Sequence, residues 1–190
     1  MQALQCHIPR AAPGDMPLDQ WRGAAHARPA LRPMVQGDAD TVAQLVGCAM
    51  NADEGRQARD TFTFHFSCRE HGIDDGRAYF VLPAEGVIKG IVGLHCYSWG
   101  PPENVWLAWF AVDPGAHGQG LGAQLMQAIT HYAIQLGYMK LFIETYSTPE
   151  FAKARDFYRA HGFAPAGGIQ AYLPNGGDMV VFCKELPARV

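Results

Sequence analysis

Three glycines at alternate positions, Gly118, Gly120 and Gly122, form a turn whose spacing is suited to holding a phosphate. An apolar run at 105–112 and a short break at 113–116 precede them, and apolar residues recur at helical spacing after them. The start of a helix offers unpaired N–H donors and the positive end of the helix dipole, which together attract an anion. Glycines lack the side chains that would hold a diphosphate away from those amides. The sequence therefore predicts a buried strand, an anion-binding turn and a helix, with a plain strand–helix junction as the alternative.

Two common phosphate-binding patterns fit this turn less well. The P-loop requires Lys and Ser/Thr after its glycines, and neither follows here. The dinucleotide fingerprint is closer, because Gly118-x-Gly120-x-x-Ala123 matches it and Glu144 lies roughly 20 residues downstream, where a ribose-binding acid is expected. However, residues 113–117 separate the first glycine from the preceding strand. The chain also offers one good copy of the strand–helix–strand unit that this fold repeats.

Two segments of the chain together resemble the GNAT N-acetyltransferase family. Residues 112–114 followed by 118–122 are similar to the family's acetyl-coenzyme A signature, which usually reads Gln/Arg-x-x-Gly-x-Gly/Ala. Residues 154–163 are similar to the family's helix that ends in Phe-Tyr-x-x-x-Gly-Phe. The resemblance extends over about residues 30–186, judged by the order of the expected elements. One departure is His117, which stands where the family usually has Gln or Arg.

The resemblance implies that the protein uses acetyl-coenzyme A (acetyl-CoA) without a metal, and that an amine attacks the thioester directly, with no covalent acyl-enzyme. In that family the central strand splays away from its parallel neighbour. The pantetheine arm lies in the gap, where it completes the hydrogen bonding of the strand amides. The residues expected to bind the coenzyme are Phe110, Ala111, Val112, His117, Gly118, Gln119, Gly120, Leu121, Gly122 and Ala123.

The expected catalytic residues are a tyrosine and a glutamate. In the resemblance, Tyr158 corresponds to the tyrosine whose hydroxyl points at the coenzyme sulfur, and we expect it to be the general acid. A phenol with a pKa near ~10 stays protonated at neutral pH and can donate to a departing thiolate. Glu144 is the candidate general base, since strand ends in such sheets commonly face ligands. A structural role for Glu144 is an alternative, and Glu103, His95 or a chain of waters are alternative bases.

The acceptor is the part of the reaction about which the sequence says least. The resemblance implies a primary amine, and both a small molecule and a peptide remain open. The side chains that could attract an ammonium group or stack on an organic cation are Trp99, Trp106, Trp109, Tyr146, Asp53, Glu54, Glu103 and Glu144. Strand alternation places Trp106 and Trp109 on opposite faces, so that both cannot line one pocket.

The hydrophobic pattern predicts a mixed α/β fold with helices on both faces of a sheet. The expected strands are 30–35, 77–82, 87–97, 105–112, 140–145, 163–172 and 179–185, and the expected helices are 39–50, 57–69, 121–136 and 149–162. Strands 105–112 and 140–145 form a parallel pair, and a turn at 83–86 makes the two strands around it an antiparallel hairpin. With the resemblance, this is an acyl-CoA N-acyltransferase (GNAT) fold of about seven strands, mostly antiparallel around the parallel pair.

Two local features of the first helices are also predicted. Asp38 is expected to cap the first helix through its side chain. Phe62, Phe64 and Phe66 of the second helix lie near the expected acceptor site, and we expect them in the core because large apolar residues are mostly buried.

Composition is that of an ordinary globular protein. The chain has 190 residues, and its net charge of −3 gives no basic surface for nucleic acid. Five scattered cysteines without a Cys-x-x-Cys pair favour reduced thiols in the cytoplasm over disulfides or a zinc site. No apolar run approaches the ~20 residues of a membrane span, so no membrane association is expected. We expect residues 1–28 to be a disordered leader and 29–190 a single acetyltransferase domain, with a homodimer left open.

Two functions from other classes remain alternatives to catalysis. The same fold and glycine turn would serve a sensor that binds an acyl-CoA without turning it over. A dinucleotide-binding module is the other alternative, because of the partial match to the dinucleotide fingerprint.

Overall fold

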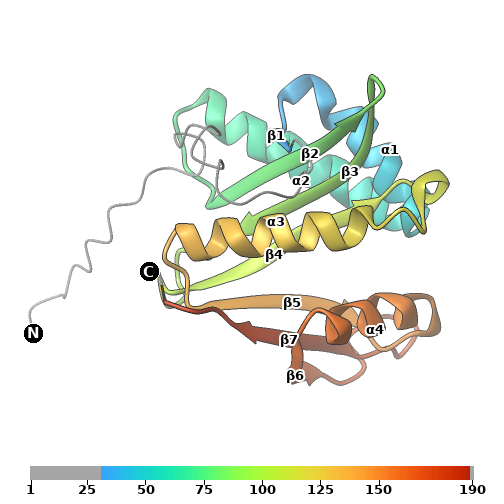
Figure 1. The fold of residues 1–190 in the computed structure, drawn as a ribbon, viewed down its shortest axis with the longest axis vertical. Coiled ribbons are helices and arrows are strands. Elements are labelled where there is room, and N and C mark those ends of the chain that lie inside the picture. Colours follow the sequence, from blue (N-terminus) through green and yellow to red (C-terminus); the bar gives the residue numbers. More distant parts are fainter. Residues whose placement is uncertain (1–30, 189–190) are drawn as a thin grey trace, which may run out of the picture.

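One mixed sheet forms the centre of the fold. Its strands are β1 (Arg32–Pro33), β2 (Arg77–Ala84), β3 (Val87–His95), β4 (Asn104–Val112), β5 (Lys140–Tyr146), β6 (Ala164–Ile169) and β7 (Met179–Glu185). They lie in the order β1-β2-β3-β4-β5-β7-β6 (Figure 1). Strand β4 is parallel to β5, and every other neighbouring pair is antiparallel. This computed structural model describes residues 31–188, so the leader expected at 1–28 lies outside the described residues.

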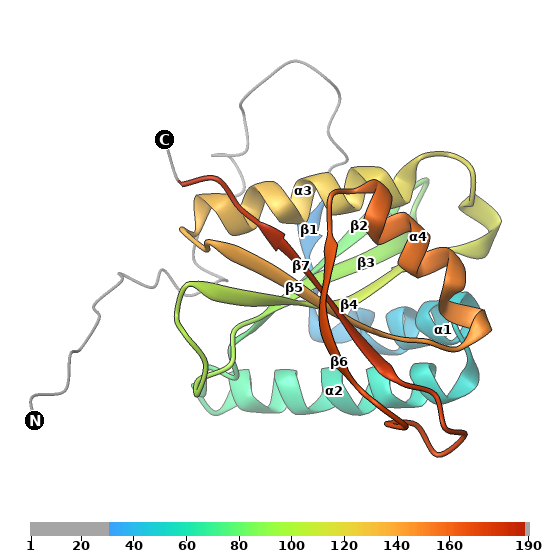
Figure 2. The same cartoon turned by 90° about the horizontal axis from the view of Figure 1, so that it is seen from below.

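Helices cover both faces of the sheet. The described residues form α1 (Ala39–Ala49), α2 (Ala52–Glu70), α3 (Leu121–Gln135) and α4 (Ala152–Ala160), with short 3-10 turns η2 (Gln36–Asp38), η3 (Pro114–Ala116) and η4 (Pro149–Phe151). Helices α1 and α2 lie on one face, and α3 and α4 lie on the other (Figure 2). The predicted mixed sheet with a parallel central pair and helices on both faces is confirmed. None of the helices within residues 31–188 has both the length and the apolar character needed to cross a bilayer.

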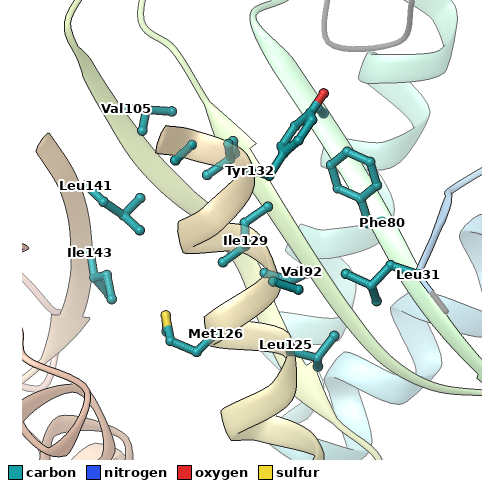
Figure 3. Close-up of a cluster of buried hydrophobic side chains, with 14 of the residues drawn as sticks. Leu31, Phe80, Val92, Val105, Leu125, Met126, Ile129, Tyr132, Leu141 and Ile143 are labelled. Atoms are coloured by element: carbon teal, nitrogen blue, oxygen red, sulfur yellow. The ribbon is translucent and has the colours of Figure 1, made fainter. Parts of the chain in front are cut away.

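A hydrophobic cluster fixes α3 against the sheet. Leu125, Ile129 and Tyr132 recur along one face of the helix, as the sequence predicts, and are almost completely buried (Figure 3). The Tyr132 ring packs edge-on against Phe80 of β2, with 5.0 Å between the ring centroids. Each large apolar side chain buried in this way contributes roughly 1.5–3 kcal/mol. The packing holds the N-terminus of α3 in a fixed position at the end of β4.

A second cluster holds α1 and α2 against the opposite face of the sheet. Phe62 and Phe66 of α2 are buried in it or at its margin, as predicted. The prediction for Phe64 is wrong, since its side chain is 56% exposed. Residues two apart on a helix point about 200° away from each other, so Phe64 cannot share the buried face.

The first two helices also begin differently from the prediction. Helix α2 starts at Ala52 rather than 57, because the Asn51 side chain accepts a hydrogen bond from the N–H of Glu54 at 2.9 Å. Asp38 does not cap α1 through its side chain. Instead its carboxylate accepts two hydrogen bonds from the Arg32 guanidinium at 2.6 and 2.8 Å, which ties the start of α1 to β1.

The hairpin before β4 is tighter than the sequence indicates. Pro83 and Ala84 continue β2, and the turn consists of Glu85 and Gly86, whose φ angles of 52° and 79° are both positive. Two left-handed residues in a two-residue hairpin turn match the twist of the flanking strands. Strand β3 ends at His95 rather than 97.

Candidate active site

The parallel pair β4–β5 is joined over a short stretch. Pairing runs from Asn104 opposite Lys140 to Trp106 opposite Phe142, and there it stops. Beyond Trp106 the two strands diverge (Figure 1), while β5 stays paired with β7 as far as Tyr146. The rest of β4 therefore has backbone N–H and C=O groups on this edge without a strand to bond. This is the opening between parallel strands that the resemblance implies.

A β-bulge lies in β4 at the side of this opening. Val92 of β3 pairs with Phe110, but the adjacent Gly93 pairs with Ala108, which leaves Trp109 without an opposite residue. A bulge adds one residue to a strand, so it shifts the alternation of side chains between the two faces. Trp109 consequently packs in the cluster on the α1–α2 face, where its ring contacts Phe62.

The bulge overturns one prediction about the tryptophans. Trp106 is opposite His95 in the ladder, and His95 is opposite Arg77, so these three side chains share a face. That face is the α2 side, because the Arg77 guanidinium lies over the ring of Phe64 at 5.9 Å. Trp106 and Trp109 therefore lie on the same face, although strict alternation predicts opposite faces. Trp109 lines the cavity described next, whereas Trp106 does not and packs against Tyr97 and Phe142.

A cavity of about 860 Å³ passes through the opening between β4 and β5 and reaches both faces of the sheet. Its size is in the range of small-molecule sites. Nine of the ten residues expected to bind the coenzyme line it: Phe110, Ala111, Val112, His117, Gly118, Gly120, Leu121, Gly122 and Ala123. Gln119, the tenth, is exposed and does not line the cavity. Tyr158, Glu144 and His95 also line the cavity, whereas Glu103 does not.

The glycine turn presents backbone donors to this cavity. Gly118 and Gly120 have φ angles of 79° and 75°, a left-handed conformation that favours glycine. Gly120 is the N-cap of α3 and supplies no side chain, and the first intrahelical bond runs from the N–H of Gln124 to its carbonyl. The N–H groups of residues 121–123 therefore have no partner within the helix.

The base of the turn is anchored by a charged pair. Asp113 accepts a hydrogen bond from the N–H of Gly115 at 3.0 Å and receives the Lys89 ammonium at 2.7 Å. The lysine bond foremost, followed by the Gly115 amide, lowers the pKa of Asp113 below its usual value. Asp113 thus joins the end of β4 to β3 and fixes the direction in which the chain enters the turn.

Gly122 allows α3, α4 and β4 to meet closely. A Cβ at this position would lie 3.4 Å from Cε2 of Phe157 and 3.9 Å from Cγ2 of Val112. The Phe157 ring in turn packs on Phe110, with 5.5 Å between centroids. A Cβ alone would therefore make ordinary van der Waals contact, and only a side chain longer than a methyl group would press on the Phe157 ring of α4.

Tyr158 lies on α4 beside the end of β4. Its side chain is 7% exposed and is surrounded by the rings of Phe110, Phe163 and Phe182 at centroid distances of 6.5, 6.3 and 6.1 Å. Burial raises the pKa of Tyr158 to about 12, so the hydroxyl stays protonated at neutral pH. Among the described residues nothing hydrogen-bonds to this hydroxyl, which leaves its proton available to a ligand in the cavity.

Two carboxylates face the cavity from the α2 side of the sheet. Glu144 projects from β5, and Glu54 projects from the first turn of α2. Partial burial raises the pKa of Glu144, and burial followed by repulsion from Glu144 raises the pKa of Glu54. Burial, with the charges of both carboxylates, raises the pKa of Tyr146 to about 12. Within residues 31–188 neither carboxylate has an ion-pair partner, so this end of the cavity suits a positively charged group.

The two alternative general bases, His95 and Glu103, lie in different parts of the structure. His95 lines the cavity, and burial, together with the nearby positive charge of Arg77, lowers its pKa to about 4, so the imidazole is neutral. Glu103 lies at the closed end of the β4–β5 pair, where its carbonyl accepts hydrogen bonds from the N–H groups of Met139 and Lys140. His95 therefore has access to the cavity and Glu103 does not.

The polar cavity residues that sequence reasoning missed include Arg77, Tyr79 and Tyr97. Arg77 and Tyr79 are two residues apart on an expected strand, so their shared face could be predicted. That β2 lies near the opening depends on the order of strands in the sheet, which a single sequence does not give.

This fold and cavity define an acyltransferase of the GNAT type, and comparison with known proteins agrees. The sequence model of the acetyltransferase (GNAT) family matches residues 39–163. The chain belongs to the GNAT acetyltransferase family. No curated protein sequence matches it.

Solved structures share the fold at low sequence identity. A protein from Desulfovibrio desulfuricans assigned to the GNAT family superposes with a TM-score of 0.73 at 23% identity, covering 83% of this chain and 99% of that one. The ribosomal-protein-S18-alanine N-acetyltransferase of Escherichia coli superposes with a TM-score of 0.64 at 18% identity, covering 83% of this chain and 93% of that one. An N-acetyltransferase from Staphylococcus aureus Mu50 superposes with a TM-score of 0.62 at 18% identity, covering 83% of this chain and 98% of that one. At such identities the likeness establishes the fold.

Proposed function

We propose that the protein transfers the acetyl group of acetyl-CoA to the primary amine of a small molecule or peptide. One observation carries this proposal: the β4–β5 ladder ends at Trp106 and Phe142, and a continuous cavity runs through the opening from the glycine turn to Glu144. Such a passage lets a thioester reach from an anion-binding turn on one face to an acceptor on the other.

The chain's own residues fit the coenzyme along this passage. The free amides at the start of α3 suit the diphosphate, and the left-handed Gly118 and Gly120 turn them toward the cavity. The unpaired edge of β4 at Phe110, Ala111 and Val112 suits the amide groups of the pantetheine arm, which would complete the ladder. When bound, the coenzyme supplies an activated acetyl group as its thioester.

The protein's contribution to the reaction is positioning and proton transfer. As the amine nitrogen bonds to the acetyl carbon, the carbon–sulfur bond breaks and the nitrogen loses a proton. Glu144 accepts that proton, directly or through water, and a raised pKa makes it a better base than an ordinary carboxylate. The Tyr158 hydroxyl donates a proton toward the sulfur as it leaves. The β4 amides hold the thioester oxygen and stabilise the charge that develops on it.

Two measurements on the full chain test this proposal. Acetyl-CoA is expected to raise the melting temperature more than NAD does, because only a ligand that binds the folded state stabilises it. Release of free coenzyme A thiol is then measured over a panel of primary amines. Thiol release that depends on an amine supports the enzyme, whereas acetyl-CoA binding without release from any amine identifies a sensor. Stabilisation by NAD alone would contradict both.

A further inference from the structure

The α2 side of the cavity carries opposite charges at its two ends. Resting on the proposed function, we infer that the acceptor is an amine that also carries a carboxylate. Arg77 and the Tyr79 hydroxyl bind the carboxylate, while the amino group lies toward Glu144 and Glu54. The acceptor is then a zwitterion of the amino-acid type rather than a simple amine or a diamine.

The first observation is an unsatisfied hydroxyl. Tyr79 is 4% exposed and lines the cavity, yet its hydroxyl has no hydrogen-bond partner within the described residues. A buried polar group without a partner costs about 1–3 kcal/mol, and such groups are rare in folded proteins. The ring is held in place, because it lies over Gly93, where a Cβ would come within 2.5 Å of Tyr79 Cδ1, and it packs edge-on against Phe62 at 5.1 Å. Burial has the larger effect and raises the pKa of this hydroxyl, while the charge of Arg77 lowers it, so the hydroxyl and the guanidinium lie close together.

The second observation is a fixed and partly open arginine. The side chain of Arg77 is 22% exposed and lines the cavity, and its Nη1 donates to Asp75 at 3.2 Å. Asp75 is itself held by His65, whose Nδ1 lies 2.9 Å from its carboxylate, and by the backbone N–H of Arg77 at 3.2 Å. Asp75 is the one carboxylate within residues 31–188 that pairs with this guanidinium. The remaining donors of the guanidinium form a planar fork that matches a carboxylate.

Within residues 31–188, Arg77 forms an ion pair with Asp75 and with no other carboxylate. His95 stands opposite Arg77 in the β2–β3 ladder and is neutral at physiological pH, with a pKa of about 4. The nearest acid, Asp75, is already shared between His65 and Arg77. A carboxylate from the acceptor would therefore meet a positive charge and the free Tyr79 hydroxyl at the same place.

The two ends belong to one cavity, which Tyr97 also lines. Burial chiefly raises the pKa of Tyr97, the charge of Glu144 raises it further, and the charge of Arg77 lowers it. One phenol thus experiences both charges. A second ammonium group in place of the carboxylate would face Arg77 and be repelled, which disfavours a diamine.

Matched acceptor pairs test the inference. Thiol release from acetyl-CoA is measured with the L-amino acids, β-alanine and γ-aminobutyrate, and with the carboxamide of each. The carboxylate form of the best acceptor is expected to exceed its carboxamide in kcat/KM by about 10–100-fold, the range for a charge-assisted pair. Arg77→Gln is expected to remove most of this preference. It should lower kcat/KM for the carboxylate form more than for the carboxamide, because only the carboxylate loses a charge-assisted pair.

A conservative variant separates binding from folding. Tyr79→Phe removes a hydroxyl that has no partner, so the melting temperature should stay equal or rise, while KM for the carboxylate acceptor rises about 3–10-fold. The control is Arg56→Gln, a surface arginine of α2 paired with Asp53, which should not change the preference. Two outcomes would overturn the inference and leave the transferase proposal standing. One is a higher kcat/KM for carboxamides than for carboxylates in the wild type, and the other is an equal loss of kcat/KM for both forms in Arg77→Gln.

The inference remains testable if no acceptor is turned over. Binding of the same amino acids to the protein saturated with coenzyme A is then measured by calorimetry. Amino acids that bind more tightly than their carboxamides, with Arg77→Gln abolishing the difference, support the carboxylate site even though the transferase proposal has failed. Equal affinity for both forms overturns it.

Discussion

Tyr158 of α4 and Phe110 of β4 lie ring to ring across the opening of the sheet, with 6.5 Å between their centroids. Phe110 is the fourth residue of β4 beyond the end of the β4–β5 ladder, so it lies on the stretch of β4 that has no strand partner on its β5 side, and it lines the same cavity as Tyr158. A proton donor and a free stretch of strand are thereby brought together by elements far apart in the sequence. This relationship makes the role of Tyr158 directly testable.

Replacing Tyr158 with Phe is expected to lower kcat by about 10–10³-fold, the effect of losing a positioned proton donor. The ring keeps its contacts, so the melting temperature and the affinity for acetyl-CoA should change little. Because the pKa of Tyr158 is about 12, the wild-type enzyme should show no alkaline loss of activity from this group below about pH 10. Thiol-release kinetics at saturating substrates provide the measurement. The control is Tyr132→Phe, which alters a core tyrosine distant from the cavity, and equal rates for Tyr158→Phe and wild type would remove Tyr158 from the mechanism.

Replacing Glu144 with Gln is expected to lower kcat/KM by about 10–10²-fold near neutral pH, as for loss of a general base. In the wild type the rate should fall as the pH drops through the raised pKa of Glu144, and the variant should lack that limb. A pH–rate profile of both proteins measures this. If the rate of Glu144→Gln still falls at low pH, the group that titrates is not Glu144. Glu54→Gln is then the next variant to examine.

Replacing Glu144 with Gln should also stabilise the folded protein, because folding and the protonation of this carboxyl are linked. The pKa of Glu144 is higher in the folded state than in the unfolded chain, so its protonated form favours folding, and stability is lost as the pH rises through the folded pKa. At pH 7 Glu144→Gln should therefore melt at a higher temperature than wild type. The difference should vanish below about pH 4, where the carboxyl is protonated in both states. Scanning calorimetry across this range gives the answer, and a lower melting temperature of the variant at pH 7 would contradict the assigned environment.

Replacing Gly120 with Ala is expected to weaken acetyl-CoA binding by about tenfold. A Cβ there meets no atom within 4 Å, so the effect comes from the φ of 75°, which costs an L-residue roughly 1–2 kcal/mol and favours a turn with redirected amides. Calorimetric titration with acetyl-CoA measures the change. Gly37→Ala is the matched control, since Gly37 is exposed, has open space around it and lies in η2 away from the cavity. Equal affinity of Gly120→Ala and wild type would show that the turn does not hold the diphosphate.

Replacing Asp75 with Asn should destabilise the protein by about 3 kcal/mol, because it leaves Arg77 and His65 without the buried carboxylate between them. Burial raises the pKa of Asp75, but hydrogen bonds from His65 and Arg77 outweigh it, and the pKa is lowered overall. Its stabilisation is therefore present above the unfolded pKa and lost as the pH falls through the folded value. Urea denaturation at pH 7 and near pH 3 checks both points, with the exposed Asp53→Asn as control. A variant as stable as wild type at pH 7 would show that the Asp75 network is not what orders this end of the cavity.

Much of the frame was open to prediction from local patterns. The long apolar strand, the glycine turn and the periodic face of Leu125, Ile129 and Tyr132 depend on neighbours in the sequence, so 3.6-residue and two-residue periodicities identify them. Gly137 and Gly162 both have positive φ angles where the last turns of α3 and α4 end, as their positions in the sequence indicate. One error arose where a contact between two elements overrode a local preference, since Asp38 bonds Arg32 of β1 instead of capping α1.

The sequence by itself determined the family, the glycine turn and the candidate proton donor, because these depend on motifs short enough to be recognised along one chain. The tertiary structure alone decided which polar residues share the acceptor end. The bulge at Trp109 placed both tryptophans on one face, and the strand order brought Arg77, Tyr79 and Glu144 to one cavity. A side chain's face is fixed by the ladder it joins, and its neighbours by the order of the strands. Neither is encoded in the spacing of residues along a single segment.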